Sequence, residues 1–411
     1  MTDYYKKALI LILAAIFLSG CAGMKHKPIE SDQIQDKQPG KTMTESLSRL
    51  SPGDYPDFRD DMNFAQIAES TTKTLDYLNK IPASRIFQYG PDSYTALQLR
   101  SSVKKFRDFV SSKPNHSAMN EFIKKNFIVY KAAGAPETGK VLFTGYYEPF
   151  LKGSLKKTAR YKYPVYTKPS DLLIIDLSRF GYEFKGKKIK ARLNGDTLEP
   201  YYDRYAIEEK KALEDKAEVL VWVDDRIDLF FLQVQGSGVI FLESGGNMKV
   251  HYHESNGHPY SSIGKYFMEK GIFKKEEISM QKMREWMLSH PDKISEVLGY
   301  NKSYVFFKEE PDGPIGCLNV KITPGRSLAL DRSVYPDAGL AFVSTEKPVV
   351  EGDGKVKKWE PFSRFIYNQD TGGAIKGPGR ADFFWGSGEY ARTAAGHMKN
   401  NGDLYFLVLK P

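Results

Sequence analysis

The chain has 411 residues, of which 41% are hydrophobic and 13% aromatic, so it is long enough for two domains with sizeable cores. Its two cysteines, Cys21 and Cys317, exclude a scaffold held by several disulfides. Its formal charge of +9 fits an anionic polymer, an anionic lipid surface or a nucleic acid, and lysines that only keep the surface solvated explain it about as well.

The N-terminus predicts export. Two lysines precede an apolar run from Ala8 to Leu18, which is too short to span a bilayer as a mature helix. We therefore expect residues 1–20 to be a signal peptide. The segment Leu18-Ser19-Gly20-Cys21 resembles a bacterial lipobox, which implies that Cys21 becomes a lipidated first residue and anchors the chain to a membrane. An ordinary cleaved signal with an incidental cysteine is the alternative.

The residue after the cysteine indicates the destination. Ala22 stands where lipoproteins kept at the inner membrane carry aspartate, so we expect an outer-membrane lipoprotein that faces the periplasm of a bacterium. Export argues against a nucleic-acid partner. If Cys21 is acylated, the chain has no cysteine pair for an intramolecular disulfide. Residues 21–45 are polar and predict a flexible tether.

Three helices should follow the tether, because apolar residues recur there at helical spacing. The first stripe runs from Phe64 to Leu78 and ends at Pro82, and the second carries Leu99, Val103, Phe106 and Val110. The third begins at Ser117. We interpret these stripes as core packing against a β-rich body.

From Val141 onward, short apolar runs separated by Gly, Pro and Asp predict mainly β structure. In the strand from Val141 to Pro149, Tyr146 and Tyr147 should point to opposite faces, so one of them should face away from the core. An exposed tyrosine is a common platform for a sugar ring, although packing at a strand edge explains it about as often. Residues 219–223 and 230–234 predict two more strands.

Polar groups cluster around these strands. Gln233-Val-Gln-Gly-Ser-Gly238 combines amides, a hydroxyl and glycines, which suits an uncharged ligand rich in hydroxyl groups. Three aspartates between the strands could be catalytic acids, but a solvated turn explains them better, namely Asp224, Asp225 and Asp228.

Three histidines, His251, His253 and His258, give only a weak indication of a metal site. A pair of them could bind a metal ion, but a third ligand at convincing spacing is missing. The sequence has no metalloprotease, serine-hydrolase or phosphate-loop motif, and we expect neither a metal nor another cofactor. Further elements are expected as helices at 261–298 and 390–397 and as strands at 301–307, 320–322, 327–330 and 403–409.

The stretch from Asn368 to Gly388 is rich in glycine and carries two aspartates, a lysine and an arginine. We interpret it as a Gly-rich loop in which the backbone approaches a ligand closely while charged groups surround it. A plain set of tight turns is the alternative.

Six motifs, in order along the chain, together resemble the membrane-bound lytic murein transglycosylase A family, which carries a C-terminal three-aspartate domain. They are Phe143-Thr-Gly-Tyr-Tyr, Gln233-Val-Gln-Gly-Ser-Gly, Ser303-Tyr-Val-Phe-Phe, Asp331-Arg-Ser, Gln369-Asp-Thr-Gly-Gly-Ala-Ile-Lys-Gly and Asp382-Phe-Phe-Trp-Gly-Ser-Gly.

The resemblance implies a mainly β fold with a helical N-terminal part. A double-psi β-barrel domain (residues 46–150 and 306–411) would carry an inserted second β-barrel domain (residues 151–305), with a glycan held in the cleft between them. The chain would cleave the β-1,4 bond between N-acetylmuramic acid and N-acetylglucosamine in peptidoglycan and leave a 1,6-anhydromuramic acid end. It would act as a monomer without a cofactor or metal.

By the same resemblance, Asp382 would be the single catalytic residue. The residues that would bind substrate are Thr144, Gly145, Tyr146, Gln235, Gly236, Ser237, Asp370 and Lys376.

The chemistry requires Asp382 to be protonated near neutral pH, although a free aspartate titrates near ~3.9. The apolar Phe383, Phe384 and Trp385 could raise its pKa, and Asp370 could add like-charge repulsion or simply form a turn. We expect Lys376 and Arg380 to meet carboxylates of the substrate. Two alternatives stay open: a hydrolase of β-1,4 glycans on the same barrel, and a lipoprotein that binds the wall without cleaving it.

Overall fold

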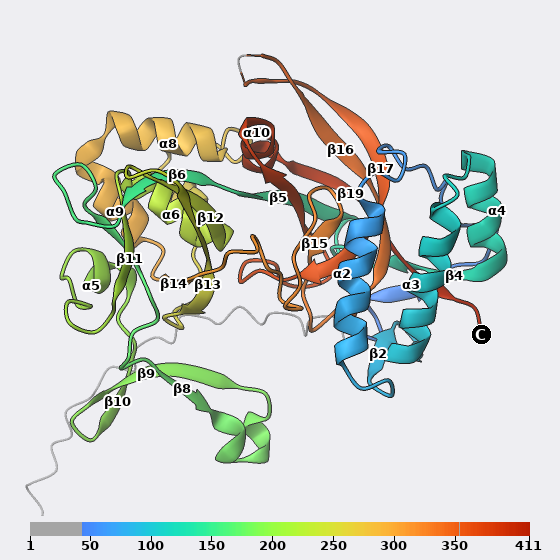
Figure 1. Ribbon diagram of the computed structural model, residues 1–411, viewed down its shortest axis with the longest axis horizontal. Helices are drawn as coiled ribbons and strands as arrows, with labels where there is room; N and C mark the ends of the chain where they lie inside the picture. Colours follow the sequence, from blue (N-terminus) through green and yellow to red (C-terminus); the bar gives the residue numbers. More distant parts are fainter. Residues whose placement is uncertain (1–42, 353) are drawn as a thin grey trace, which may run out of the picture. The chain divides into compact units, whose positions relative to one another are not determined.

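The computed structural model describes residues 43–352 and 354–411 (Figure 1). The predicted signal peptide, Cys21 and nearly all of the tether lie outside these residues. None of the helices in this part of the chain is long and apolar enough to cross a membrane. The helices are α2 (Ile67–Lys80), α3 (Ala96–Val110), α4 (His116–Asn126), α5 (Arg204–Glu208), α6 (Arg226–Gln235), α7 (Ile263–Glu269), α8 (Met280–Ser289), α9 (Ile294–Gly299) and α10 (Glu389–His397).

Six strands close into a barrel. Their hydrogen-bonded order is β5-β18-β15-β17-β16-β19, and β19 pairs again with β5. Two of the pairs, β18 with β5 and β15 with β17, are parallel. Strands β4 (Phe127–Ala132) and β1 (Leu47–Arg49) extend this sheet from β19. The six barrel strands are β5 (Val141–Glu148), β15 (Ser327–Ala329), β16 (Leu340–Val350), β17 (Val356–Asp370), β18 (Arg380–Ser387) and β19 (Lys399–Leu409).

A second six-stranded sheet is built from the chain between β5 and β15. Its order is β14-β13-β12-β6-β11-β7, and β6 runs parallel to β12. The strands are β6 (Phe150–Ser154), β7 (Tyr163–Tyr166), β11 (Val219–Val223), β12 (Ser237–Leu242), β13 (Asn247–Ser255) and β14 (Val305–Glu309). The prediction of a mainly β fold, with a barrel domain and a second β domain inserted in it, is confirmed.

Two smaller sheets complete the described strands. A hairpin joins β2 (Ile86–Tyr89) to β3 (Asp92–Thr95). A separate three-stranded sheet consists of β8 (Leu173–Asp176), β9 (Lys188–Asn194) and β10 (Thr197–Pro200), in the order β10-β9-β8.

The three predicted N-terminal helices are α2, α3 and α4, and their apolar stripes face the barrel. Leu75 and Leu78 of α2 and Val103 and Phe106 of α3 are buried in the same core as the barrel strands. Thr95 begins α3 with a capping box, in which its hydroxyl accepts from the backbone of Gln98 and the Gln98 side chain accepts from the Thr95 backbone. These helices therefore act as the covering layer that the sequence predicted.

The predicted strand at 230–234 is wrong, because these residues belong to α6. The Asp225 carboxylate caps this helix at its N-terminus, and Gly236 ends it with a left-handed φ of 83°. Phe230 packs in one apolar cluster and Leu232 in another, so the helix is buried on opposite sides. The run from Leu229 to Leu232 is continuously apolar, and such a short run gives no periodicity by which sequence could separate a helix from a buried strand.

The expectation that one tyrosine of β5 faces away from the core is also wrong. Tyr146 and Tyr147 are both buried, with 8% and 7% of their surface exposed. Tyr146 packs beside Phe384 of the barrel, whereas Tyr147 lines a small cavity with Phe231 of α6. Alternation along the strand holds, but both of its faces are covered.

A buried ion pair joins the segment before α2 to the barrel. Arg326 donates from Nη1 and Nη2 to the two carboxylate oxygens of Asp60, at 2.6 and 2.9 Å, and both side chains are almost completely buried. The remaining donors of the guanidinium reach the backbone oxygens of Ala65 and Phe365. The pair is satisfied only when both partners are present.

We therefore expect Asp60→Ala to destabilise the fold by about 3–5 kcal/mol, because it leaves the Arg326 charge buried without a carboxylate. Chemical denaturation followed by circular dichroism measures the change. Asp108→Ala is the control, since Asp108 pairs with Arg107 at an exposed site, where an ion pair contributes about 1 kcal/mol at most. Equal effects of the two substitutions would contradict this role of Arg326.

Candidate active site

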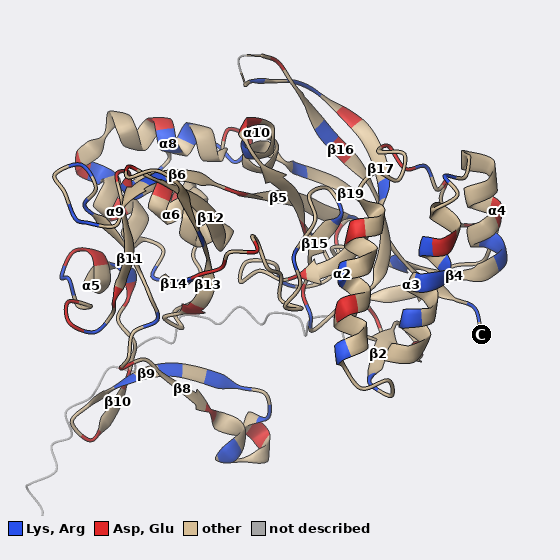
Figure 2. Ribbon diagram, in the orientation of Figure 1, with Lys and Arg blue, Asp and Glu red and all other residues tan. Residues whose placement is uncertain are grey.

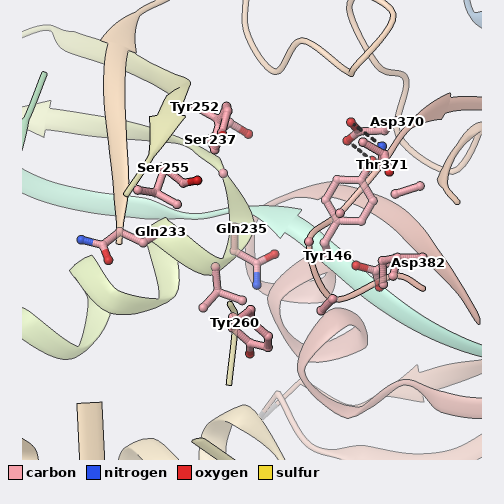
Figure 3. Close-up of a pocket in the computed structure, with 18 of the residues that line it drawn as sticks. Tyr146, Gln233, Gln235, Ser237, Tyr252, Ser255, Tyr260, Asp370, Thr371 and Asp382 are labelled. Carbon is pink, nitrogen blue, oxygen red and sulfur yellow. Dashed lines mark hydrogen bonds between the residues drawn. The ribbon is translucent and has the colours of Figure 1, made fainter. Parts of the chain in front are cut away.

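A cavity of about 600 Å³ lies between the barrel and the second sheet. Figure 3 shows Tyr146, Asp370 and Asp382 on one side of it and Gln233, Gln235 and Ser237 on the other. Among the described residues that line it, Asp370 and Asp382 carry the carboxylates. A cavity of this size, whose lining combines apolar side chains with groups that can form hydrogen bonds, is typical of a ligand site.

Asp382 lies on β18, so the expectation that residues 368–388 form one loop is wrong. Residues up to Asp370 belong to β17, and those from Arg380 to Ser387 belong to β18. In the parallel pair β18–β5, Asp382 lies opposite Thr144. The Thr144 hydroxyl donates to Asp382 Oδ1 at 2.6 Å, and Arg380 Nη2 donates to the same hydroxyl at 3.4 Å.

The surroundings of Asp382 favour its protonated form. Burial raises the pKa of its carboxyl to about 6, against the lowering effects of the Thr144 hydrogen bond and of the Arg380 charge. Since Thr144 donates to Oδ1, the acidic proton of the neutral form is carried by Oδ2. Asp382 can therefore act as a proton donor close to neutral pH.

Asp370 is the second carboxyl group of the cavity, and the surrounding chain holds it firmly. Its Oδ1 accepts from the backbone N–H groups of Cys317 and Thr371, and its Oδ2 accepts from the Tyr146 hydroxyl at 2.9 Å. Burial raises its pKa to about 6, and the Asp382 charge contributes to the increase. Of the two roles that the sequence left open, this geometry favours the turn-forming one.

Tyr146 lies in the cavity wall and binds one of the two carboxyl groups. Its hydroxyl donates to Asp370, and its ring packs 5.1 Å from that of Phe384. Burial raises the pKa of Tyr146 well above its ordinary value, so the hydroxyl stays a donor.

Gln235, Gly236 and Ser237 reach the cavity from the second sheet, where α6 ends and β12 begins. Gln235 Oε1 accepts from the backbone N–H of Tyr147 at 2.9 Å, which ties the end of α6 to β5. Gly236 is needed at the turn because it adopts a positive φ that other residues rarely take.

Three of the predicted residues do not line the cavity, and of these only Thr144 binds a lining residue, Asp382. A side chain at Gly145 would meet Trp385 at 2.6 Å, so glycine there allows the Trp385 ring to pack against β5. Lys376 is exposed on the loop between β17 and β18 and lies near Asp331. Hydrogen bonds to Asp331 lower the pKa of its carboxyl group, and the Lys376 charge lowers it further. The structure therefore brings Thr144, Tyr146, Gln235, Gly236, Ser237, Asp370 and Asp382 together and leaves Gly145 and Lys376 outside.

Several residues of the cavity were not singled out as substrate-binding in the sequence, among them Tyr252, Ser255 and Tyr260. Tyr252 and Ser255 are three residues apart, so a period-two pattern would place them on opposite faces of β13, and an irregularity in the register between Tyr252 and Glu254 changes this relation. Tyr260 lies in an irregular segment after β13, where periodicity gives no signal.

The three histidines lie in different surroundings. His251 lines the cavity, and burial lowers its pKa to about 4, with Lys308 adding to the effect, so its ring is neutral. His253 is exposed, and His258 donates from Nε2 to the backbone oxygen of Tyr201 at 2.6 Å. No group of three or more His, Cys, Asp or Glu residues that could hold a metal ion occurs within residues 43–352 and 354–411.

The three aspartates just before α6 and in its first turn make structural contacts. Arg284 of α8 forms ion pairs with Asp225 and Asp228. Asp224 pairs with Arg160. Asp225 and Asp228 hold α8 against the start of α6, and Asp225 also caps α6. A structural role therefore explains these aspartates better than a catalytic one.

Two family models match the chain: the MltA specific insert domain at residues 142–308 and the 3D domain at residues 326–408. The chain is 31% identical over 285 residues to the membrane-bound lytic murein transglycosylase A of Escherichia coli (strain K12), which is 69% of each chain.

Solved structures of lytic murein transglycosylases are also similar to this chain. A membrane-bound lytic murein transglycosylase from Agrobacterium tumefaciens superposes with a TM-score of 0.71 at 29% identity, over 89% of this chain and 98% of that one. E. coli MltA with bound chitohexaose gives a TM-score of 0.69 at 26% identity, over 92% of this chain and 98% of that one.

Replacing the acid should stabilise the protein at high pH. The ionised Asp382 is disfavoured in the folded state, so its cost appears as pH rises from 3.8 through about 6 and is constant above. Asp382→Asn removes this cost and keeps an acceptor for Thr144. Thermal unfolding should show a gain of about 1–2 kcal/mol at pH 8 that disappears near pH 4, given partial screening by water in the cavity. Asp108→Asn, on the surface of α3, should show no such gain, and a gain of the same size at both pH values would contradict the raised pKa.

Proposed function

This chain belongs to the membrane-bound lytic murein transglycosylase A family, and we propose that it cleaves the β-1,4 bond between N-acetylmuramic acid and N-acetylglucosamine in peptidoglycan, forming a 1,6-anhydromuramic acid end. Its E. coli relative is named for lytic action on murein, and a structure of that relative holds chitohexaose. The observation that carries the proposal is the raised pKa of Asp382 in a cavity that the barrel and the second sheet share.

Asp382 acts first as an acid. Its proton on Oδ2 passes to the glycosidic oxygen as the bond to the anomeric carbon breaks. The carboxylate that results keeps the hydrogen bond from Thr144, and Arg380 supplies positive charge behind that hydroxyl. Burial favours the acid before the step, and these two groups stabilise the anion after it.

The substrate supplies the nucleophile. The C6 hydroxyl of the muramic acid ring attacks its own anomeric carbon, and Asp382 accepts the proton that this hydroxyl releases. The carboxyl group returns to its protonated state, so atoms and charge balance within one turnover. A protein nucleophile and a positioned water are then unnecessary, whereas a hydrolase needs two carboxylates.

The other residues position the glycan. Gln235 and Ser237 offer an amide and a hydroxyl from the second sheet, and Tyr146 presents its ring between the two carboxyl groups. The neutral His251 adds a polar group without charge. Gly236 and Asp370 shape this wall, Thr144 holds Asp382, and Gly145 lets Trp385 pack against β5. The exposed Lys376 meets carboxylates of the lactyl or peptide groups.

The location and organisation of the chain are further parts of the proposal. The protein is membrane-associated, as its family name states, and we assign the anchor to lipid on Cys21 at the outer membrane, facing the periplasm. Residues 21–45 tether a monomer whose catalytic domain comprises 46–150 and 306–411, with 151–305 as the inserted domain.

A hydrolase is the second candidate, because Asp370 is another carboxyl group with a pKa of about 6 in the same cavity. Its oxygens are occupied by two backbone N–H groups and a tyrosine hydroxyl, which leaves it poorly placed to attack or to activate water. A lipoprotein that only binds the wall would need neither carboxyl group.

Digestion of purified murein sacculi by the wild-type chain, Asp382→Asn and Asp370→Asn separates these functions. Mass spectrometry should show products lighter by one water than hydrolytic ones. Asp382→Asn should reduce cleavage by about a hundredfold or more while sacculi still bind it, since a general acid contributes that much. Asp370→Asn should lose at most about tenfold and still give anhydro ends, because the amide oxygen can keep the two backbone bonds while the amide NH2 donates to the Tyr146 oxygen.

Products that contain the added water would favour the hydrolase, most clearly if Asp370→Asn were as inactive as Asp382→Asn. Unchanged cleavage by Asp382→Asn would remove this residue from the mechanism. Wild-type chain that binds sacculi and releases nothing would support the wall-binding alternative.

A further inference from the structure

The three-stranded sheet β8–β10 and the turns between β8 and β9, here called the flap (residues 173–200), carry an apolar face that the sequence does not reveal. In the register of the sheet, Ile175 pairs with Ile189, Leu173 with Ala191, and Leu198 with Leu193. Cross-strand partners point to the same face of a sheet. The side chains of one face are therefore Leu173, Ile175, Ile189, Ala191, Leu193, Leu198 and Pro200.

Much of this face is open to solvent. Leu193 is 63% exposed, and Leu173, Ile189 and Leu198 are exposed as well. The opposite face carries Lys188, Lys190 and Arg192 in alternation with the apolar residues. Exposed apolar patches with a polar rim mark interaction sites in soluble proteins.

The end of the flap carries aromatic and basic residues. It consists of two 3-10 turns, Leu177–Arg179 and Tyr182–Phe184, with Phe180 72% and Tyr182 83% exposed. Between residues 176 and 188 there are four basic and two acidic side chains. Lys185 lies 5.5 Å above the ring of Tyr182, and Lys187 lies 5.7 Å above that of Phe184. Figure 2 shows basic residues along β9 and in these turns.

The flap is attached to the cavity domain at its base. Lys190 donates to Ser255 at 2.7 Å and forms an ion pair with Glu254, both at the end of β13. Figure 1 shows β8–β10 extending from the second sheet, so the distal turns lie away from the residues that bind glycan. The flap can therefore contact another surface while the cavity stays open.

We propose that the flap docks on an anionic phospholipid surface, where Phe180, Tyr182 and the apolar face enter the headgroup region and the basic residues contact lipid phosphates. Aromatic rings with a polar edge favour the membrane–water interface, and each nearby lysine adds attraction to anionic lipid. The charges at the turns are Arg179, Lys185, Lys187 and Lys188.

Other occupants fit less well. Lysine is depleted in protein–protein interfaces, whereas four lysines lie between residues 185 and 190, which disfavours a partner protein or a second copy. A membrane is also the surface nearest to a chain of a membrane-bound family, and it complements the charge. The docking is independent of the cleavage chemistry, since none of these residues lines the cavity.

Hydrogen–deuterium exchange of the full-length chain on vesicles tests the proposal. The protein is reconstituted with its natural N-terminus on vesicles of phosphatidylethanolamine and phosphatidylglycerol, and in parallel on vesicles of phosphatidylcholine. Peptides from residues 173–200 should exchange several-fold more slowly on the anionic vesicles only. Lys185→Glu with Lys187→Glu, or Phe180→Ser with Tyr182→Ser, should remove that protection while the N-terminal anchor keeps the chain on the vesicle.

Matched controls keep the test specific. Lys104→Glu with Lys105→Glu makes the same change of charge on exposed α3, and Tyr205→Ser with Leu288→Ser removes exposed apolar groups outside the flap. Both should keep the protection, and all variants should still cleave soluble glycan strands. Equal exchange of the flap on the two kinds of vesicle would overturn the proposal. Protection that needs murein, or that increases with protein concentration without lipid, would overturn it in favour of the wall or of a second copy.

Discussion

The parallel pairing of β5 with β18 is the constraint on which the site depends. It sets Thr144 opposite Asp382, so that the one carboxyl group proposed to move a proton has a fixed hydroxyl partner on one oxygen and a free second oxygen. Burial supplies the raised pKa, and the Thr144–Arg380 pair limits the increase. A shift of this pairing by one residue would turn the Asp382 side chain to the other face of the strand.

The second wall of the cavity depends on α6. This helix is buried between two apolar clusters, and its final residue, Gln235, binds the backbone of β5 beside the barrel. Asp370 binds the backbone of Cys317 and of Thr371, in the loop after β17, and also the Tyr146 hydroxyl of β5. Strand β5 therefore fixes the positions of Asp382, Tyr146 and Gln235 relative to one another. Because β5 is buried on both faces, this arrangement is rigid.

Local sequence patterns were enough to predict part of the fold and of the candidate site. Helical stripes predicted α2, α3 and α4, and the motif around Asp382 indicated the residue that the fold places in the cavity. Periodicity failed at α6, whose apolar residues pack into two separate clusters. The glycines around Asp382 concealed the strand β18, whose pairing with β5 joins residues 238 positions apart. The long hairpin of β16 and β17 and the flap register also arise from pairings between strands, which sequence alone does not state.

The central claim is that one carboxyl group is held neutral until pH 6 by its surroundings and then moves a proton in both directions. A site-resolved carbon NMR titration of the Asp382 carboxyl group, assigned by comparison with Asp382→Asn, measures this property without any substrate. The account predicts a midpoint of about 6. A midpoint close to the ordinary value of 3.8 would contradict it, because the residue would then have no proton to give near neutral pH.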